Sequence, residues 1–84
     1  MSDLTTNIVV PDKPDKLISS SAIEGYSYDS SNYVLTVWYK GKKPSIYRYL
    51  MVYPNLMSQI FDSGGSIGSK AGKLLRANPK QKLR

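Results

Sequence analysis

The sequence predicts an α+β fold in which a three-stranded antiparallel β-meander is followed by two C-terminal helices. Three observations support this prediction. Apolar and polar residues alternate from Tyr33 to Lys40, as they do in a half-buried strand. Similar stretches lie on both sides of it across short turns, and short connections favour antiparallel neighbours. Apolar residues then recur at helical spacing after Pro54 and again after Ser66, which predicts two helices.

Turn-forming residues separate the three expected strands. The first strand is expected from Ile23 to Tyr28 and ends at Asp29-Ser-Ser-Asn32, whose side chains can bond to their own backbone. The second strand covers Tyr33 to Lys40, and the turn at Gly41 leads to a third strand from Ser45 to Leu50. The second strand places Leu35, Val37 and Tyr39 on one face and Val34, Thr36 and Trp38 on the other.

Local signals also define the two expected helices. Pro54 suits the first turn of a helix, where its missing N–H would be unpaired in any case. Gly64-Gly65 should end this helix, and Ser66 can cap the next one by accepting a hydrogen bond from a backbone N–H. We interpret Gly64–Ser69 as a turn between helices rather than a phosphate-binding loop, because it lacks the Walker pattern. Asn78-Pro79 should stop the second helix. The residues expected on the apolar sides are Leu56, Met57, Ile60 and Phe61 in the first helix and Ile67, Ala71, Leu74 and Leu75 in the second.

The chain outside these elements is expected to form an N-terminal arm and a C-terminal tail. Residues 1–18 contain Pro11-Asp-Lys-Pro-Asp-Lys16, which can neither pair in a sheet nor continue a helix, so we expect a disordered, flexible arm. Within it, Ile8-Val9-Val10 is a candidate for a short edge strand. The folded domain is expected to span residues 19–78, and residues 79–84 to form a basic tail.

Composition argues against catalysis and metal binding. The chain of 84 residues has neither cysteine nor histidine, so thiolate nucleophiles, cysteine metal sites and the best side chain for proton transfer near neutral pH are missing. Asp29 and Asp62 stand alone, without a paired carboxylate. We therefore expect a non-enzymatic protein without a cofactor or bound metal. No apolar run is long enough to span a bilayer and no signal peptide is present, which predicts a cytoplasmic protein that does not bind membranes.

Several short motifs occur in an order that resembles the KTSC domain, a small domain found at the C-terminus of some lysyl-tRNA synthetases and as a stand-alone protein of bacteria and phages. The matching motifs are Ser20-Ser21, Ile23, Tyr28-Asp29, Leu35-Thr-Val37-Trp-Tyr39, Gly41, Tyr47-Arg-Tyr49, Pro54, Ser66-Ile-Gly68 and Leu75-Arg76. The resemblance covers residues 19–77 and implies a small α+β fold with a nucleic-acid-binding role. The chain departs from the family pattern at Ser27, where glycine is usual, and in an extra residue before Pro54. After Gly68, Lys70-Ala-Gly72 replaces aromatic residues and an asparagine.

Positive charge is concentrated in the second part of the chain. The net charge is +6, but residues 1–33 hold two basic and five acidic residues (−3), while residues 34–84 hold ten basic and one acidic (+9). Such asymmetry suggests a polyanion or an acidic protein surface as partner, although a solvated basic face without a partner gives the same pattern. The candidate binding cations are Lys40, Lys42, Lys43, Arg48, Lys70, Lys73, Arg76, Lys80, Lys82 and Arg84. Trp38 and Tyr26 are candidate aromatic contacts on an exposed sheet face, with burial in the core as the alternative. For Tyr39, Tyr47 and Tyr49, the resemblance to core positions of the KTSC domain implies burial.

Two functions are consistent with these features. The first is a small binding module that uses its basic face to hold RNA or DNA through phosphate contacts. The alternative is a phage-type regulator or inhibitor that docks on an acidic surface of host transcription machinery, such as bacterial RNA polymerase, in the host cytoplasm. Trp38, Arg48 and the tyrosines would anchor that contact, because aromatic residues and arginine dominate binding hot spots. We expect a monomer, with association through an exposed strand edge as a third possibility.

Overall fold

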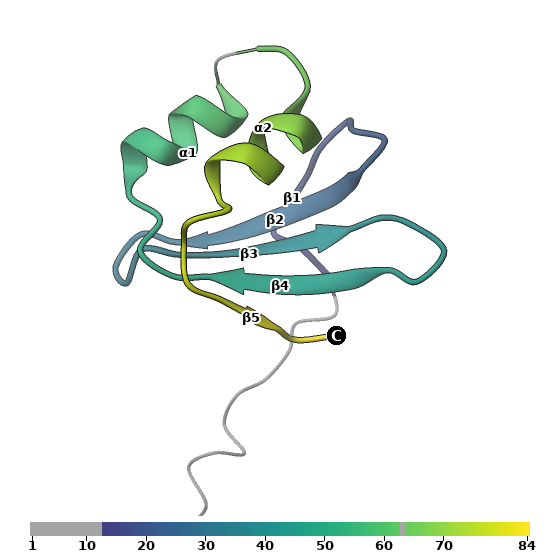
Figure 1. Cartoon of the computed structure of the whole chain (residues 1–84), viewed down its shortest axis with the longest axis horizontal. Coiled ribbons are helices and arrows are strands. Elements are labelled where there is room, and N and C mark those ends of the chain that lie inside the picture. Colours follow the sequence, from purple (N-terminus) through teal and green to yellow (C-terminus); the bar gives the residue numbers. More distant parts are fainter. Residues whose placement is uncertain (1–12, 63) are drawn as a thin grey trace, which may run out of the picture.

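The structure, a computed structural model, describes residues 13–62 and 64–84, so the candidate strand Ile8-Val9-Val10 lies outside it. The chain forms an antiparallel sheet of five strands with both helices on one face (Figure 1). The elements in chain order are β1 (Lys16–Leu17), β2 (Ile23–Asp29), β3 (Val34–Tyr39), β4 (Ser45–Tyr49), α1 (Pro54–Phe61), α2 (Ile67–Leu74) and β5 (Lys80–Lys82). The strands lie in the sheet in chain order, and the helices are inserted between β4 and β5. The predicted α+β class is therefore confirmed.

The three predicted strands are present, but a three-stranded meander was an undercount. Short strands extend the sheet at both edges, where β1 pairs with β2 and β5 pairs with β4. Lys80–Lys82 is thus an edge strand rather than part of a free tail, and Lys16–Leu17 belongs to the sheet rather than to the arm. Strands of two or three residues are too short to show an alternating pattern. They form where an existing sheet edge offers unpaired N–H and C=O groups.

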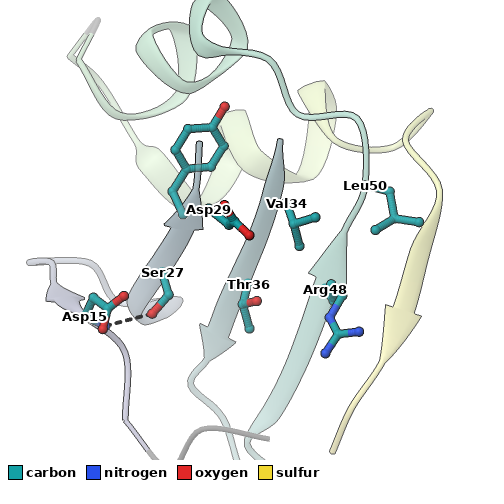
Figure 2. Close-up of a pocket in the computed structure, with 8 residues that line it drawn as sticks. Asp15, Ser27, Asp29, Val34, Thr36, Arg48 and Leu50 are labelled. Carbon is teal, nitrogen blue, oxygen red and sulfur yellow. Dashed lines mark hydrogen bonds between the residues drawn. The ribbon is translucent and has the colours of Figure 1, made fainter. Parts of the chain in front are cut away.

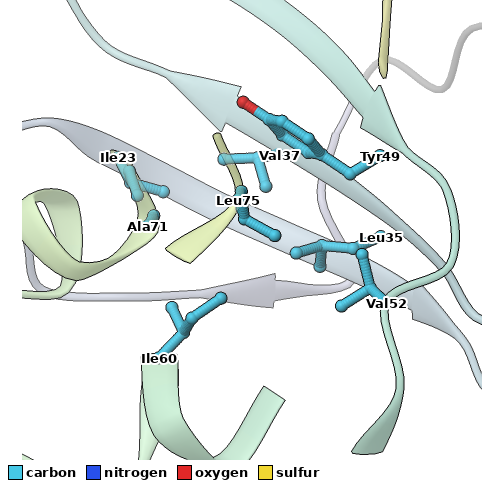
Figure 3. Packing of buried hydrophobic residues seen from close by; sticks show 8 residues of the cluster. All are labelled: Ile23, Leu35, Val37, Tyr49, Val52, Ile60, Ala71 and Leu75. Atoms are coloured by element: carbon cyan, nitrogen blue, oxygen red, sulfur yellow. The ribbon is translucent and has the colours of Figure 1, made fainter. Parts of the chain in front are cut away.

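The hydrophobic core lies between the sheet and the helices. Leu35 and Val37 of β3, which the alternation placed on one face, are both fully buried on the helix-covered side of the sheet. Val52, Ile60 and Leu75 join them from the connection after β4, from α1 and from the end of α2 (Figure 3). Burying one such side chain favours folding by about 1.5–3 kcal/mol.

The helices begin and are separated as predicted. Pro54 opens α1, and Gly64 and Gly65 follow its end with φ angles of 80° and 79°, which glycine adopts without strain. Ser66 caps α2, because its Oγ accepts a hydrogen bond of 3.3 Å from the Ser69 N–H. These residues form the turn between the two helices.

The chain leaves α2 earlier than predicted. The helix ends at Leu74, before the expected stop at Asn78-Pro79. The Asn78 side-chain amide donates hydrogen bonds to the backbone carbonyls of Leu50 and Met51 at 2.9 and 3.1 Å. This contact ties the chain after α2 to the chain after β4, and β5 then pairs with β4. A contact between residues so far apart in sequence leaves no periodic signal.

The opposite face of the sheet carries a second apolar group. Trp38 is 4% exposed, and Ile46, its neighbour in register on β4, is also buried. Pro14 lies against this face at Gly25, where an added β-carbon would meet Pro14 Cγ at 2.6 Å. The indole N–H of Trp38 has no hydrogen-bond partner within the described chain. Trp38 is therefore an interior residue, the alternative that the sequence left open, and not an exposed contact.

Candidate functional site

Strand β5 brings two lysines next to two tyrosines. In the register of β4 and β5, Lys80 lies opposite Tyr49 and Lys82 lies opposite Tyr47. Directly opposite residues in antiparallel strands project from the same face, with Cβ atoms about 5 Å apart. Since Tyr49 belongs to the core, both lysines project from the helix-covered face. The Lys80 Nζ lies 5.9 Å from the centre of the Tyr49 ring, within the range of a cation–π contact.

The end of α2 adds two more cations. The Lys80 Nζ also donates a hydrogen bond of 3.0 Å to the backbone carbonyl of Arg76. Lys73 lies in the last turn of α2, where a cation interacts favourably with the helix dipole. Lys73, Arg76, Lys80 and Lys82 are all exposed, and no acidic residue follows Asp62 in the sequence. We call these four cations the basic row.

Three tyrosines form a cluster beside the basic row. The hydroxyls of Tyr39 and Tyr49 are hydrogen-bonded to each other at 2.7 Å. The Tyr47 ring meets the Tyr39 ring edge-on, with ring centres 5.9 Å apart, and stacks with the Tyr49 ring at 6.2 Å. Burial is the main cause that raises the pKa of Tyr39 and of Tyr49 above the ordinary value of 10.0, so both hydroxyls hold their protons more strongly than an exposed tyrosine does. Tyr47 is partly exposed, and its hydroxyl has no hydrogen-bond partner within the described residues.

Most of the other predicted cations lie away from this row. Lys40 is tied to the chain before β2, because its Nζ donates a hydrogen bond of 2.7 Å to the Ser20 carbonyl. Lys70 turns back toward the start of α2, where its Nζ donates to the Gly64 carbonyl. The exposed cations at the β3–β4 turn and after β5 are Lys42, Lys43 and Arg84. The structure therefore groups only part of the predicted set.

Arg48 projects from the helix-free face of the sheet. It lines a shallow depression of about 400 Å³ together with Ser27, Asp15 and Asp29 (Figure 2). Its Nη1 donates a hydrogen bond of 3.3 Å to Oε1 of Gln81. The two carboxylates oppose the binding of phosphate on this face, because like charges repel. Arg48 thus does not belong to the basic row.

Tyr26 does not share a face with Trp38, contrary to the prediction. Its ring stacks on Phe61 of α1 with ring centres 4.1 Å apart. The register of β2 against β3 shifts between Ile23 and Gly25, and both Ile23 and Tyr26 pack against the core as a result. In a regular strand, Ile23 and Tyr26 would face opposite sides of the sheet because they are three positions apart. The bulge between them places both on the helix-covered face. Tyr26 is a residue that packs the helix onto the sheet.

A separate apolar patch, missed by the sequence reasoning, consists of Tyr33, Met51 and Tyr53. These side chains are 39%, 55% and 46% exposed, and the rings of Tyr33 and Tyr53 lie 4.8 Å apart. Tyr33 and Met51 have φ angles of 57° and 61°, which are uncommon for residues other than glycine. The Val52 N–H donates a hydrogen bond of 2.8 Å to the Tyr33 carbonyl and so joins the two segments. We refer to these three residues as the apolar patch.

Asp29 has the structural role at its turn that the sequence predicted. Its Oδ1 accepts hydrogen bonds from the backbone N–H groups of Ser31 and Asn32 at 2.9 and 3.3 Å. Its Oδ2 accepts one of 2.9 Å from the Asn32 side-chain amide, and this bond is the main cause that lowers the pKa of the carboxyl. The same carboxylate is therefore a stabilising element of the β2–β3 turn.

Across residues 13–62 and 64–84, no group of acidic side chains is placed to hold a metal ion, and neither helix has the length and apolar character needed to cross a membrane. No protein-family model matches the chain, and no curated protein matches it in sequence. The resemblance to the KTSC domain stays a prediction from its motifs.

Proposed function

We propose that this protein is a non-enzymatic binding module that holds nucleic acid through phosphate contacts from the basic row. The observation that carries the proposal is the pairing of β5 with β4, which sets Lys80 and Lys82 side by side on one face and brings Lys80 to the Arg76 carbonyl just after α2. Lys73 in the last turn of α2, Arg76 just after that helix, and Lys80 and Lys82 of β5 are all exposed. The carboxylates of Asp15 and Asp29 line the opposite face of the sheet and leave the basic row as the side for a polyanion.

Electrostatics determines what such a surface can do. Each phosphate neutralised by a lysine or arginine releases counterions, so binding should weaken steeply as salt is raised. Phosphate contacts carry little sequence information, and Lys73 is the cation that the exposed side of α2 contributes. The proposed module therefore binds with weak sequence preference.

The test is the binding of a labelled oligonucleotide, measured by fluorescence anisotropy at two salt concentrations. The double variant Lys80→Gln/Lys82→Gln should lose affinity and become less sensitive to salt. The matched control Lys13→Gln/Lys16→Gln removes the same charge at and before β1, on the opposite edge of the sheet. Equal losses in both variants would mean that only net charge matters. If Lys80→Gln/Lys82→Gln bound the oligonucleotide as tightly as the wild type, the basic row would not be the binding surface.

The apolar patch favours a second candidate function. Clustered exposed aromatic residues are typical of protein–protein hot spots. As the alternative, we propose a regulator that docks through Tyr33, Met51 and Tyr53 on a nucleic-acid-handling machine such as bacterial RNA polymerase. These residues replace Trp38 as anchors, because Trp38 is buried.

A pull-down from bacterial lysate, with and without nuclease, separates the two functions. Capture of a polymerase subunit that survives nuclease and is lost in Tyr53→Ser supports the regulator. Capture that disappears on nuclease treatment and in Lys80→Gln/Lys82→Gln supports nucleic acid as the partner.

A further inference from the structure

We infer that the nucleic acid is a single strand, and that Tyr47 stacks against one of its unpaired bases beside the basic row. This inference rests on the proposed function, because it concerns the same surface. It adds the form of the ligand and the side chain that contacts a base.

The spacing of the basic row suits an extended polyanion. Lys80 and Lys82 project from the same face of β5, so their Cα atoms are about 7 Å apart. Arg76 is held beside Lys80 by the hydrogen bond to its carbonyl, and Lys73 is three residues before it on α2. Consecutive phosphates of an extended single strand are separated by a comparable distance. Lys80 and Lys82 can therefore meet successive phosphates, and Arg76 lies next to Lys80 at the end of this pair.

Tyr47 is the aromatic residue placed to meet a base. It lies opposite Lys82, so a phosphate bound by that lysine would bring its nucleotide next to the Tyr47 ring. Tyr39 and Tyr49 hold the ring from two directions and are themselves joined by their hydroxyls. Tyr49 is only 6% exposed and is thus unavailable, whereas Tyr47 is partly exposed. A partly exposed ring fixed in orientation beside a cation is the arrangement that single-strand binders use to stack bases.

A duplex would use this surface less well. Its base faces are covered by stacking and pairing, so the Tyr47 ring would have no base to contact. Helix α2 is held against the core by Ala71 and Leu75, and only its outer side is free. It therefore cannot project from the fold into a major groove as a recognition helix does. Only the phosphate contacts would remain.

Three labelled ligands test the inference on the unaltered protein by fluorescence anisotropy. They are an oligothymidylate of about twelve nucleotides, a duplex of the same length, and an abasic deoxyribose-phosphate chain of the same length. We expect the oligothymidylate to bind about five-fold or more tightly than either of the others, in line with the contribution of one stacked base. Equal or tighter binding of the duplex or the abasic chain overturns the inference and leaves the proposed function in place. Failure of all three to bind at low salt overturns both.

The variant Tyr47→Val identifies the stacking residue. Valine removes the ring but favours a strand. We expect oligothymidylate to bind about five-fold more weakly, with unchanged binding of the abasic chain. The control Tyr53→Val removes an exposed ring outside the basic row. It should leave the affinities for oligothymidylate and for the abasic chain unchanged. Wild-type affinity of Tyr47→Val for oligothymidylate would overturn the assignment, and circular dichroism confirms that each variant is folded.

Discussion

Helix α2 approaches the chain before β2 so closely that a β-carbon on Gly68 would lie 2.8 Å from the Cβ of Ala22. The chain at Ala22 is itself held in place, because the Ser20 Oγ accepts hydrogen bonds from the N–H groups of Ala22 and Ile23 at 3.1 and 3.2 Å. The motif Ser66-Ile-Gly68 thus combines a helix cap with a close packing contact. Both motifs, at Ser20 and at Ser66, act in the assembly of the fold.

The first prediction concerns this close approach. Gly68→Ala should destabilise the protein by about 1–3 kcal/mol, because two carbon atoms would overlap and neither belongs to a flexible side chain. Gly72→Ala is the matched control, since a β-carbon there meets nothing within 4 Å. It should stabilise the helix by about 0.5–1 kcal/mol. Urea denaturation measures the free energy of unfolding of both variants. Equal changes of the same sign would contradict the close approach of Gly68 to Ala22.

The second prediction concerns the attachment of β5. Asn78→Ala removes the hydrogen bonds to the Leu50 and Met51 carbonyls and should cost about 1–3 kcal/mol. Because these bonds precede β5, hydrogen exchange at Gln81 and Leu83, whose N–H groups face β4, should become faster and oligonucleotide binding weaker. The control Asn55→Ala replaces an exposed amide in α1. Wild-type exchange in β5 of the Asn78 variant would show that strand pairing alone holds this edge.

The third prediction concerns acid stability. Hydrogen bonds, mainly from the Asn32 amide, lower the pKa of Asp29 below its ordinary value of 3.8. Its contribution is therefore fully present above that value and is lost as the pH falls through the lower folded-state pKa. Asn32→Ala should reduce the melting temperature at neutral pH but make it less dependent on pH in the acid range. Melting curves of both proteins across that range check this. Parallel pH profiles would contradict the role of the amide.

The fourth prediction concerns alkaline stability. Burial raises the pKa of Tyr39 and of Tyr49 above the ordinary value of 10.0, so above this pH the unfolded chain loses protons that the folded chain keeps. Stability should be fully present below pH 10 and fall as the pH rises further. Tyr39→Phe should cost about 1 kcal/mol at neutral pH and make this fall shallower. Denaturation at several pH values measures the free energy of unfolding of both proteins, and Tyr53→Phe, which changes an exposed tyrosine, is the control. An equally steep fall in Tyr39→Phe would count against this explanation.

The fifth prediction concerns the number of phosphate contacts. If a single strand contacts all four cations of the basic row, the slope of log affinity against log salt should be about −3, at about −0.7 for each contact. Lys82→Gln should make the slope shallower by about 0.7. Lys16→Gln, on the opposite edge of the sheet, should lower affinity only through net charge and leave the slope unchanged. Equal slopes for Lys82→Gln and the wild type would show that Lys82 does not contact a phosphate.

Local signals in the sequence were sufficient for the elements that depend on neighbouring residues. The alternation around Leu35 and Val37 predicted β3 and placed these two residues on one face, as the structure has them. Pro54 and Ser66 marked the helix starts, because a missing N–H and a capping hydroxyl act within one helical turn. Asp29 predicted its turn for the same reason, since its partners are two and three residues away.

Only the tertiary structure decided which residues meet across the fold. The strand β5, the burial of Trp38 and the position of Tyr26 under α1 all depend on pairing registers and on contacts between distant segments. The candidate site belongs to this second group. Sequence indicated that Lys80 and Lys82 were basic, but their place beside Tyr47 follows from the return of the chain to the edge of β4. Periodicity reports the surroundings of one element, whereas a binding surface is made where separate elements come together.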